Sequence, residues 1–244
     1  MTNIYSIKGK VKGEAKLPKV FTSPYRPDLI QRSVVAEQAF TRQPQGVDPG
    51  AGFRTSAGYF GSRKRSYRQS INKAMARLPR EKRGGGGLGK VRRVPQSVGG
   101  HRAHPPQCKD YSKKINNKEW KNALDSAIAA TANKKLVEER GHNLGEIKDL
   151  PIIIEDAVQE VKKASEAVKI LKELGLAEEL DRCRQRGVGM LLVVGEDKGV
   201  MNALNNIKGL EVATINDLDV DTLAPGTHAG RLTIWTESAI KKLD

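Results

Sequence analysis

Residues 190–194 read Met-Leu-Leu-Val-Val, and residues 195–199, which follow directly, read Gly-Glu-Asp-Lys-Gly. An uninterrupted apolar run that ends in a glycine turn is typical of a strand buried on both faces of a parallel sheet. Val200, Leu204 and Ile207 then recur at helical spacing. This stretch therefore predicts a strand, a turn and a helix, which is the repeating unit of α/β folds.

The same alternation continues on either side of this stretch. Short apolar runs occupy residues 150–154, 210–215 and 232–235, while residues 161–171 and 238–243 have helical periodicity. Strands that alternate with helices are joined by right-handed crossovers. We therefore predict an α/β fold with a mostly parallel sheet and helices on both faces, in a Rossmann-like three-layer arrangement.

The first part of the chain also has regular patterns. Residues 4–7 read as a short extended segment, and a helix is predicted from Pro27 to about Phe40. A helical stripe resumes at Trp120, continues through a charged turn and stops at Gly141, a residue suited to ending a helix. We predict that residues 1–41 and 119–244 form one globular domain, interrupted by a long loop over residues 42–118.

The excess positive charge of the chain lies in this loop. Residues 51–114 hold 17 of the 43 basic residues and only two of the 28 acidic ones, so they account for the whole net charge of +15. Neutralising phosphates with Lys and Arg releases condensed counterions, which makes nucleic acid the expected partner. Arginine outnumbers lysine here, 10 to 7, and its planar donors grip phosphates bidentately. Because aromatic residues make up only 5% of the chain, we expect backbone and shape contacts more than base stacking.

The loop is poor in long apolar side chains, so it cannot offset the entropy of ordering its own backbone. We expect it to lack regular structure and to be mobile until RNA surrounds it. Each limb of roughly 30 residues could reach on the order of 100 Å at full extension. The alternative is a disordered linker or solubility segment, although linkers seldom carry so much charge of one sign.

Other classes of protein find little support in the sequence. No stretch approaches the ~18 apolar residues of a membrane span, and the amino terminus lacks an apolar signal core, so we expect a cytosolic protein. Cys108 and Cys183 are expected to be free thiols. His101, His104 and Cys108 lack a fourth metal ligand. We assign no metal site and no catalytic residue.

Two glycine-containing stretches resemble nucleotide-binding motifs. Residues 84–90 read Gly-Gly-Gly-Gly-Leu-Gly-Lys, but Val91 stands where a P-loop needs Ser or Thr, and neither the preceding strand nor the following helix is predicted. The turn at 195–199 is well placed but lacks the three-glycine fingerprint, so we expect an ordinary turn and assign no cofactor. The acid pairs at 138–139 and 178–179 are predicted to lie on solvated helix surfaces.

Two stretches carry a resemblance to a known family. Residues 94–106 read Val-Pro-Gln-Ser-Val-Gly-Gly-His-Arg-Ala-His-Pro-Pro, and residues 24–30 read Pro-Tyr-Arg-Pro-Asp-Leu-Ile. Together with the glycine-rich basic stretch they resemble the archaeal and eukaryotic branch of the universal large-subunit ribosomal protein L-four family, and the length resembles the archaeal form. The resemblance spans the whole chain.

The resemblance implies a structural, non-enzymatic constituent of the cytoplasmic ribosome that binds large-subunit ribosomal RNA. It implies that the loop enters the RNA, that its tip helps to form the nascent-peptide exit tunnel, and that neighbouring ribosomal proteins are partners. No homo-oligomer and no membrane partner is expected.

The alternatives are a nucleotide-binding α/β enzyme and a general nucleic-acid-compacting protein. The residues that we expect to contact RNA are Arg54, Arg63, Lys64, Arg65, Arg68, Lys73, Arg77, Arg80, Lys82, Arg83, Lys90, Arg92, Arg93, Gln96, His101, Arg102, His104, Lys109, Lys113 and Lys114.

Overall fold

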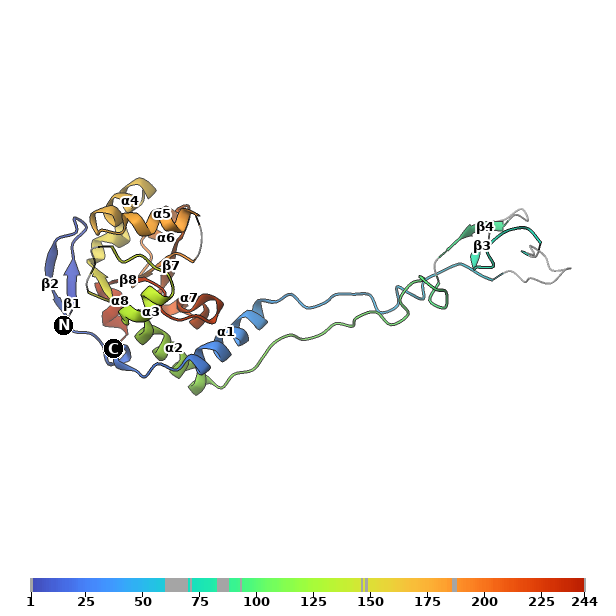
Figure 1. Ribbon diagram of the computed structural model, residues 1–244, viewed down its shortest axis with the longest axis horizontal. Coiled ribbons are helices and arrows are strands. Elements are labelled where there is room, and N and C mark those ends of the chain that lie inside the picture. The colour runs from blue at the N-terminus through green and yellow to red at the C-terminus, as the bar shows by residue number, and fades with distance from the viewer. Residues whose placement is uncertain are drawn as a thin grey trace. The chain divides into compact units, whose positions relative to one another are not determined.

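The computed structural model describes residues 2–59, 70, 72–82, 88–92, 94–145, 147, 149–185 and 188–243, with the backbone alone at 82, 88, 184 and 185. The chain divides into two compact units, of which unit 1 comprises Met1–Thr41 and Ser112–Asp244 and unit 2 comprises Arg42–Tyr111 (Figure 1). Unit 1 is therefore built from two stretches of chain that are separated in sequence by the whole of unit 2.

Unit 1 is an α/β structure around a mostly parallel sheet. The strands lie in the order β2-β1-β5-β8-β6-β7, and only the β1–β2 pair is antiparallel. The strand bounds are Thr2–Tyr5 for β1, Val11–Ala15 for β2, Ile152–Ile154 for β5, Met190–Val194 for β6, Leu210–Thr214 for β7 and Thr233–Thr236 for β8. The coarse fold class predicted from the sequence is confirmed.

Helices connect and cover these strands. Their bounds are Pro27–Thr41 for α1, Asn117–Thr131 for α2, Lys134–Glu139 for α3, Ala164–Glu173 for α4, Ala177–Gln185 for α5, Val200–Leu204 for α6, Val220–Leu223 for α7 and Glu237–Lys242 for α8. The stripe predicted from Trp120 to Gly141 is divided at Asn133, whose side chain accepts a hydrogen bond from the Lys135 amide and begins α3. Helix α6 is shorter than predicted and leaves Ile207 in the following turn. None of the described helices is long and apolar enough to cross a membrane.

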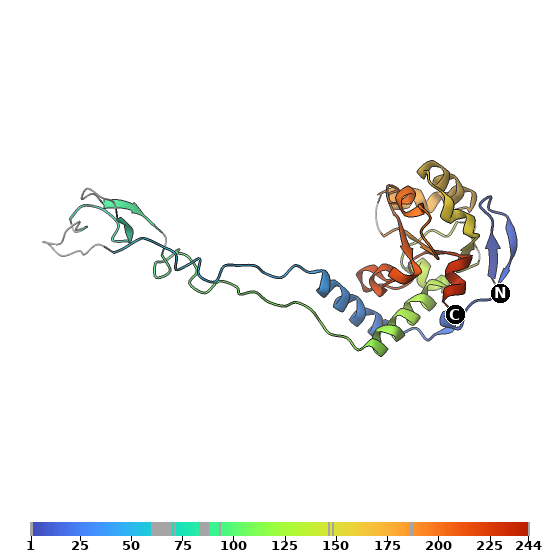
Figure 2. The same cartoon turned by 180° about the vertical axis from the view of Figure 1, so that it is seen from behind.

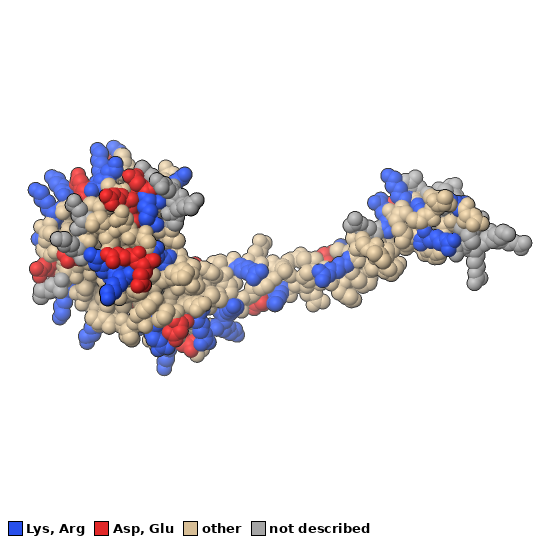
Figure 3. Space-filling model, viewed as in Figure 1, with Lys and Arg blue, Asp and Glu red and all other residues tan. Residues whose placement is uncertain are grey.

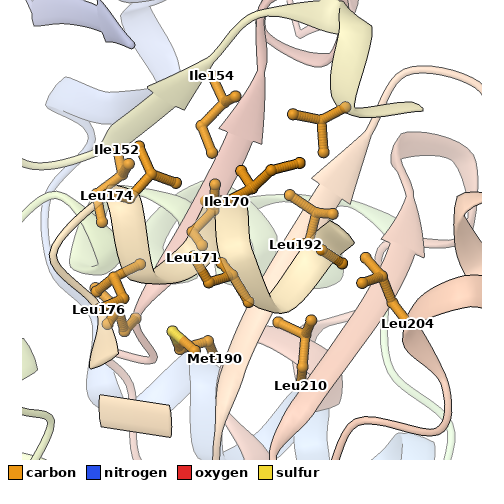
Figure 4. Close-up of a cluster of buried hydrophobic side chains, with 14 of the residues drawn as sticks. Ile152, Ile154, Ile170, Leu171, Leu174, Leu176, Met190, Leu192, Leu204 and Leu210 are labelled. Atoms are coloured by element: carbon orange, nitrogen blue, oxygen red, sulfur yellow. The ribbon is translucent and has the colours of Figure 1, made fainter. Parts of the chain in front are cut away.

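Apolar side chains from alternate strand positions form a separate cluster on each face of the sheet. In β6, Leu192 contributes to the cluster that includes residues of α4 and α6, whereas Leu191 and Val193 contribute to the cluster that includes residues of α1, α2 and α8. Figure 4 shows Ile170 and Leu171 of α4 lying against the first of these faces. Burial on both faces is the reason why β6 is an unbroken apolar run rather than an alternating one.

Unit 2 contains regular structure that the sequence did not predict. Strand β3 (Arg80–Lys82) pairs antiparallel with β4 (Leu88–Val91). The expectation that the whole loop lacks regular structure is therefore wrong, because backbone pairing here needs few large apolar side chains. Among the described residues of this unit, the small buried set includes Val94, Ser70 and Arg80.

Candidate nucleic-acid interface

Two segments of unit 2 run antiparallel and touch at more than one point. The Arg42 guanidinium lies 4.2 Å from the centroid of the Tyr111 ring. Farther along, the rings of Phe53 and His104 pack edge to face with their centroids 6.0 Å apart. Because residue numbers rise along one segment as they fall along the other, the two segments are the limbs of a hairpin. The outgoing limb includes Arg42 and Phe53, and the returning limb includes His104 and Tyr111. The limbs run side by side in both views (Figures 1 and 2).

Glycines on both limbs allow the backbone to pack closely. A Cβ on Gly52 would lie 2.1 Å from the carbonyl oxygen of Arg102, and one on Gly100 would lie 1.8 Å from that of Val94. The stretch around Gly100 forms successive turns, in which the Ser97 amide donates to Val94 at 3.2 Å and the Gly100 amide donates to Ser97 at 2.9 Å. The block that carries the family resemblance is therefore a compact turn with a buried valine at its start.

Arg80 is a predicted RNA contact, but in the structure it is only 8% exposed. Its Nη1 donates to the carbonyl of Gly89 at 3.2 Å and its Nη2 to the carbonyl of Ala76 at 3.0 Å. Its backbone also exchanges two hydrogen bonds of 3.0 Å with Gly58 on the outgoing limb. Arg80 thus ties together β3, β4 and the outgoing limb.

Most of the other described basic side chains predicted as contacts are exposed. Arg54 pairs with Asp48 at 2.6 Å, and Arg92 pairs with Glu81. On unit 1, blue and red side chains are intermixed, whereas the charged side chains on the visible face of unit 2 are mostly blue (Figure 3). The exposed predicted contacts in this unit are Arg54, Lys73, Arg77, Lys90, Arg92, Gln96, His101, Arg102, His104 and Lys109.

The remaining predicted contacts divide into two groups. Lys113 and Lys114 lie in unit 1, where they are exposed and line a cavity of about 300 Å³ together with Arg32 of α1. For Lys82 the backbone alone is described. Six residues lie outside the described part of the chain, namely Arg63, Lys64, Arg65, Arg68, Arg83 and Arg93.

The structure also bears on the alternative sites. Lys90 lies on β4 rather than at the start of a helix, which a P-loop lysine requires. Cys108 and Cys183 are both free, and Cys108 is exposed. The part of the chain that the structure describes contains no group of three His, Cys, Asp or Glu side chains able to hold a metal ion.

The carboxyl ends of β6 and β8 are where an open α/β sheet commonly binds a ligand. Here Gly195 donates its amide to Thr236 Oγ1 at 3.2 Å, and a Cβ on Gly195 would lie 2.4 Å from Ser238 Oγ. The carboxylate of Asp197 accepts from the amides of Gly199 at 2.8 Å and Met201 at 3.3 Å. Groups of the chain itself therefore pair with three amides at this turn.

The prediction that residues 178–179 lie on a solvated surface is wrong for Glu179, whose side chain is fully buried. Its carboxylate lies 2.6 Å from Nδ1 of His142, accepts two hydrogen bonds from Arg182 and accepts another from the Asn143 amide. Burial by itself would raise the pKa of Glu179, but these hydrogen bonds outweigh it and lower the pKa to about 2. The sequence carries no signal for this cluster, because His142 and Glu179 are far apart along the chain.

Comparison with known proteins gives a consistent result. A model of the Ribosomal protein L4/L1 family matches residues 15–244. The protein named large ribosomal subunit protein uL4 from Methanosphaera stadtmanae is 42% identical, over 99% of this chain and 95% of the relative. Its namesake from Haloquadratum walsbyi is 40% identical, over 99% of this chain and 98% of the relative.

The agreement extends over nearly the full length of both chains, including unit 2. It bears out the resemblance that the 94–106 block and residues 24–30 indicated. The family consists of ribosomal proteins rather than enzymes. The chain therefore belongs to the Ribosomal protein L4/L1 family.

Proposed function

We propose that the chain is a structural constituent of the large ribosomal subunit in the cytoplasm, and that it binds large-subunit ribosomal RNA mainly through unit 2. The observation that carries this proposal is the separation of charge between the units. Unit 2 holds 16 of the 43 basic residues and three of the 28 acidic ones, which leaves unit 1 with a net charge of only +2. A polyanion is therefore attracted mainly to unit 2.

Unit 2 acts in this proposal as an extended basic loop that enters folded RNA. Its two limbs contact each other and expose charged and polar side chains. The hydrogen bonds of Arg80 and the pairing of β3 with β4 stabilise the part of unit 2 that contains these strands. Phosphate contacts made in this way position a protein without reading base sequence. The tip of the loop would lie beside the nascent-peptide exit tunnel, and neighbouring ribosomal proteins would contact the remaining surfaces. In this arrangement unit 1 is a Rossmann-like body that holds the loop at the surface of the subunit.

Sedimentation of the native protein from a cell lysate tests this assignment. We expect the protein to travel with large subunits, and to leave that fraction after ribonuclease treatment. Sedimentation as a free protein in the untreated lysate would overturn the proposal. Equal affinity of the purified chain for duplex DNA and for folded large-subunit RNA at physiological salt would favour a general compacting protein instead.

A further inference from the structure

Unit 1 contains an open cavity of about 790 Å³ whose walls include basic side chains. It lies at the end of α3, beside the start of α1 and the loop over residues 225–229. Glu139 is the only carboxylic acid among the described lining residues. The lining residues that matter here are Tyr25, Arg140, Arg182, Pro225, Thr227 and His228.

Arg140 is the central group of this cavity. Its Nη2 donates to the carbonyl of Pro225 at 2.8 Å, which fixes the direction of the guanidinium. Its Nη1 is buried and has no acceptor within the part of the chain that the structure describes. A buried donor of a charged group without an acceptor is costly, and ordinarily signals an absent partner.

Two further arginines add to the positive field around Arg140. Burial, followed by repulsion from Arg231 and Arg182, lowers the pKa of Arg140 to about 10, so that it still carries its charge at neutral pH. Arg182 forms an ion pair with Glu179, and Arg231 forms one with Glu211. Among the described residues no carboxylate lies within ion-pair distance of Arg140.

The cavity wall is held in a fixed shape. Thr227 has a φ of +73°, which is unusual for a residue with a side chain, and its amide donates to Ala224 at 3.0 Å. Such strained positions persist only where the surrounding structure determines them, and they occur often at ligand sites. The Tyr25 ring at the rim is 44% exposed, which leaves a flat apolar surface beside the arginines.

We propose that this cavity binds a phosphodiester group of a folded RNA, with Arg140 and Arg182 facing the phosphate and Tyr25 beside the adjoining ribose or base. The volume favours a nucleotide unit over a lone carboxylate, which would leave most of the cavity empty. Guanidinium donors suit the two free oxygens of a phosphodiester. The identity of the RNA rests on the proposed function, but the site does not depend on unit 2.

The test compares the full-length chain with two single variants of equal charge. Arg140→Gln removes the cavity's central donor, while Lys135→Gln removes an exposed charge from α3, the helix that ends just before Arg140. Binding to large-subunit ribosomal RNA is measured over a series of salt concentrations. For Arg140→Gln we expect affinity to fall about tenfold and the slope of log affinity against log salt to become shallower by about one. Lys135→Gln is expected to keep the wild-type affinity and slope.

A second measurement on the wild-type chain does not depend on how the variant folds. Phenylglyoxal, which modifies arginine, is applied with and without hexauridylate, and modification of Arg140 is read by mass spectrometry. Protection of Arg140 by hexauridylate supports the proposal. Lack of protection, or protection by hexaglutamate but not by hexauridylate, overturns it. If wild-type RNA binding itself is absent, the proposed function fails, whereas unchanged binding by Arg140→Gln contradicts only this site.

Discussion

Replacing unit 2 by a short glycine-serine linker between Thr41 and Ser112 should leave unit 1 folded but remove most of the RNA affinity. Every residue of the two apolar clusters belongs to unit 1, so the core is intact after the deletion. The described part of unit 2 exposes six basic side chains besides the ion-paired Arg54 and Arg92. These six are Arg42, Lys73, Arg77, Lys90, Arg102 and Lys109.

These six charges set a lower limit on the expected effect, because unit 2 holds 16 basic residues in all. If each neutralises one phosphate, they contribute about four to five to the slope of log affinity against log salt. Between 50 and 200 mM salt, that slope corresponds to a change in affinity on the order of several hundredfold. We therefore expect the deletion variant to bind weakly at low salt and to respond much less to added salt.

Fluorescence anisotropy with labelled large-subunit RNA, at several salt concentrations, measures both quantities. Circular dichroism checks that unit 1 remains folded. The control keeps unit 2 and neutralises six exposed lysines on unit 1 by substitution with Gln, at Lys8, Lys10, Lys16, Lys162, Lys169 and Lys172. A folded deletion variant with the wild-type slope, or a control variant that loses as much slope as the deletion, would refute the assignment of binding to unit 2.

Three further predictions concern stability. Glu179→Gln should lower the free energy of unfolding at neutral pH by about 3 kcal/mol, because the folded state depresses the pKa of this carboxyl from 4.5 to about 2. The stability that this ionised carboxyl contributes is present above the unfolded pKa and is lost as pH falls from about 4.5 towards 2. Over this range, the free energy of unfolding measured by chemical denaturation should therefore fall less for Glu179→Gln than for wild type. The control is Glu178→Gln, which changes an exposed carboxyl. Arg80→Ala should speed tryptic cleavage within unit 2 by about tenfold. Arg77→Ala, which changes an exposed side chain, should weaken RNA binding without speeding cleavage. Equal cleavage rates for the two variants would contradict the role of Arg80. Leu191→Ala, which truncates a side chain with no exposed surface, should cost about 2–5 kcal/mol in denaturant unfolding of unit 1.

The sequence predicted the central strands of unit 1 well, because each of them is buried on both faces and so appears as an unbroken apolar run. The run at residues 190–194 is β6 at its full length, and the run at 232–235 differs from β8 by one residue at each end. Strand β2 was missed because it lies at the edge of the sheet, where its side chains are largely exposed and alternate with lysine and glycine. A periodic pattern of apolar residues does not reveal an edge strand such as β2, which is a strand because it pairs with β1.

The polar interior could not be predicted for a different reason. Glu179 and Arg140 are charged residues of the kind usually found on solvated helix surfaces. In the structure each contacts a group that is distant in sequence, His142 for Glu179 and Pro225 for Arg140. Arg80 likewise appeared to be one phosphate contact among many, because its carbonyl partners become neighbours only when β3 and β4 pair. Charge counts predict which segment attracts a polyanion, but they do not predict which charged side chains form hydrogen bonds and ion pairs inside the protein.

The most direct test of the central claim is ultraviolet crosslinking of native large subunits followed by mass spectrometry of the RNA-linked peptides. If unit 2 is the principal RNA-binding segment, peptides that contain Lys73, Arg77, Arg102 or Lys109 should carry crosslinked nucleotides of large-subunit RNA. Peptides from unit 2 that remain unmodified, while those of unit 1 carry all of the crosslinks, would contradict the claim.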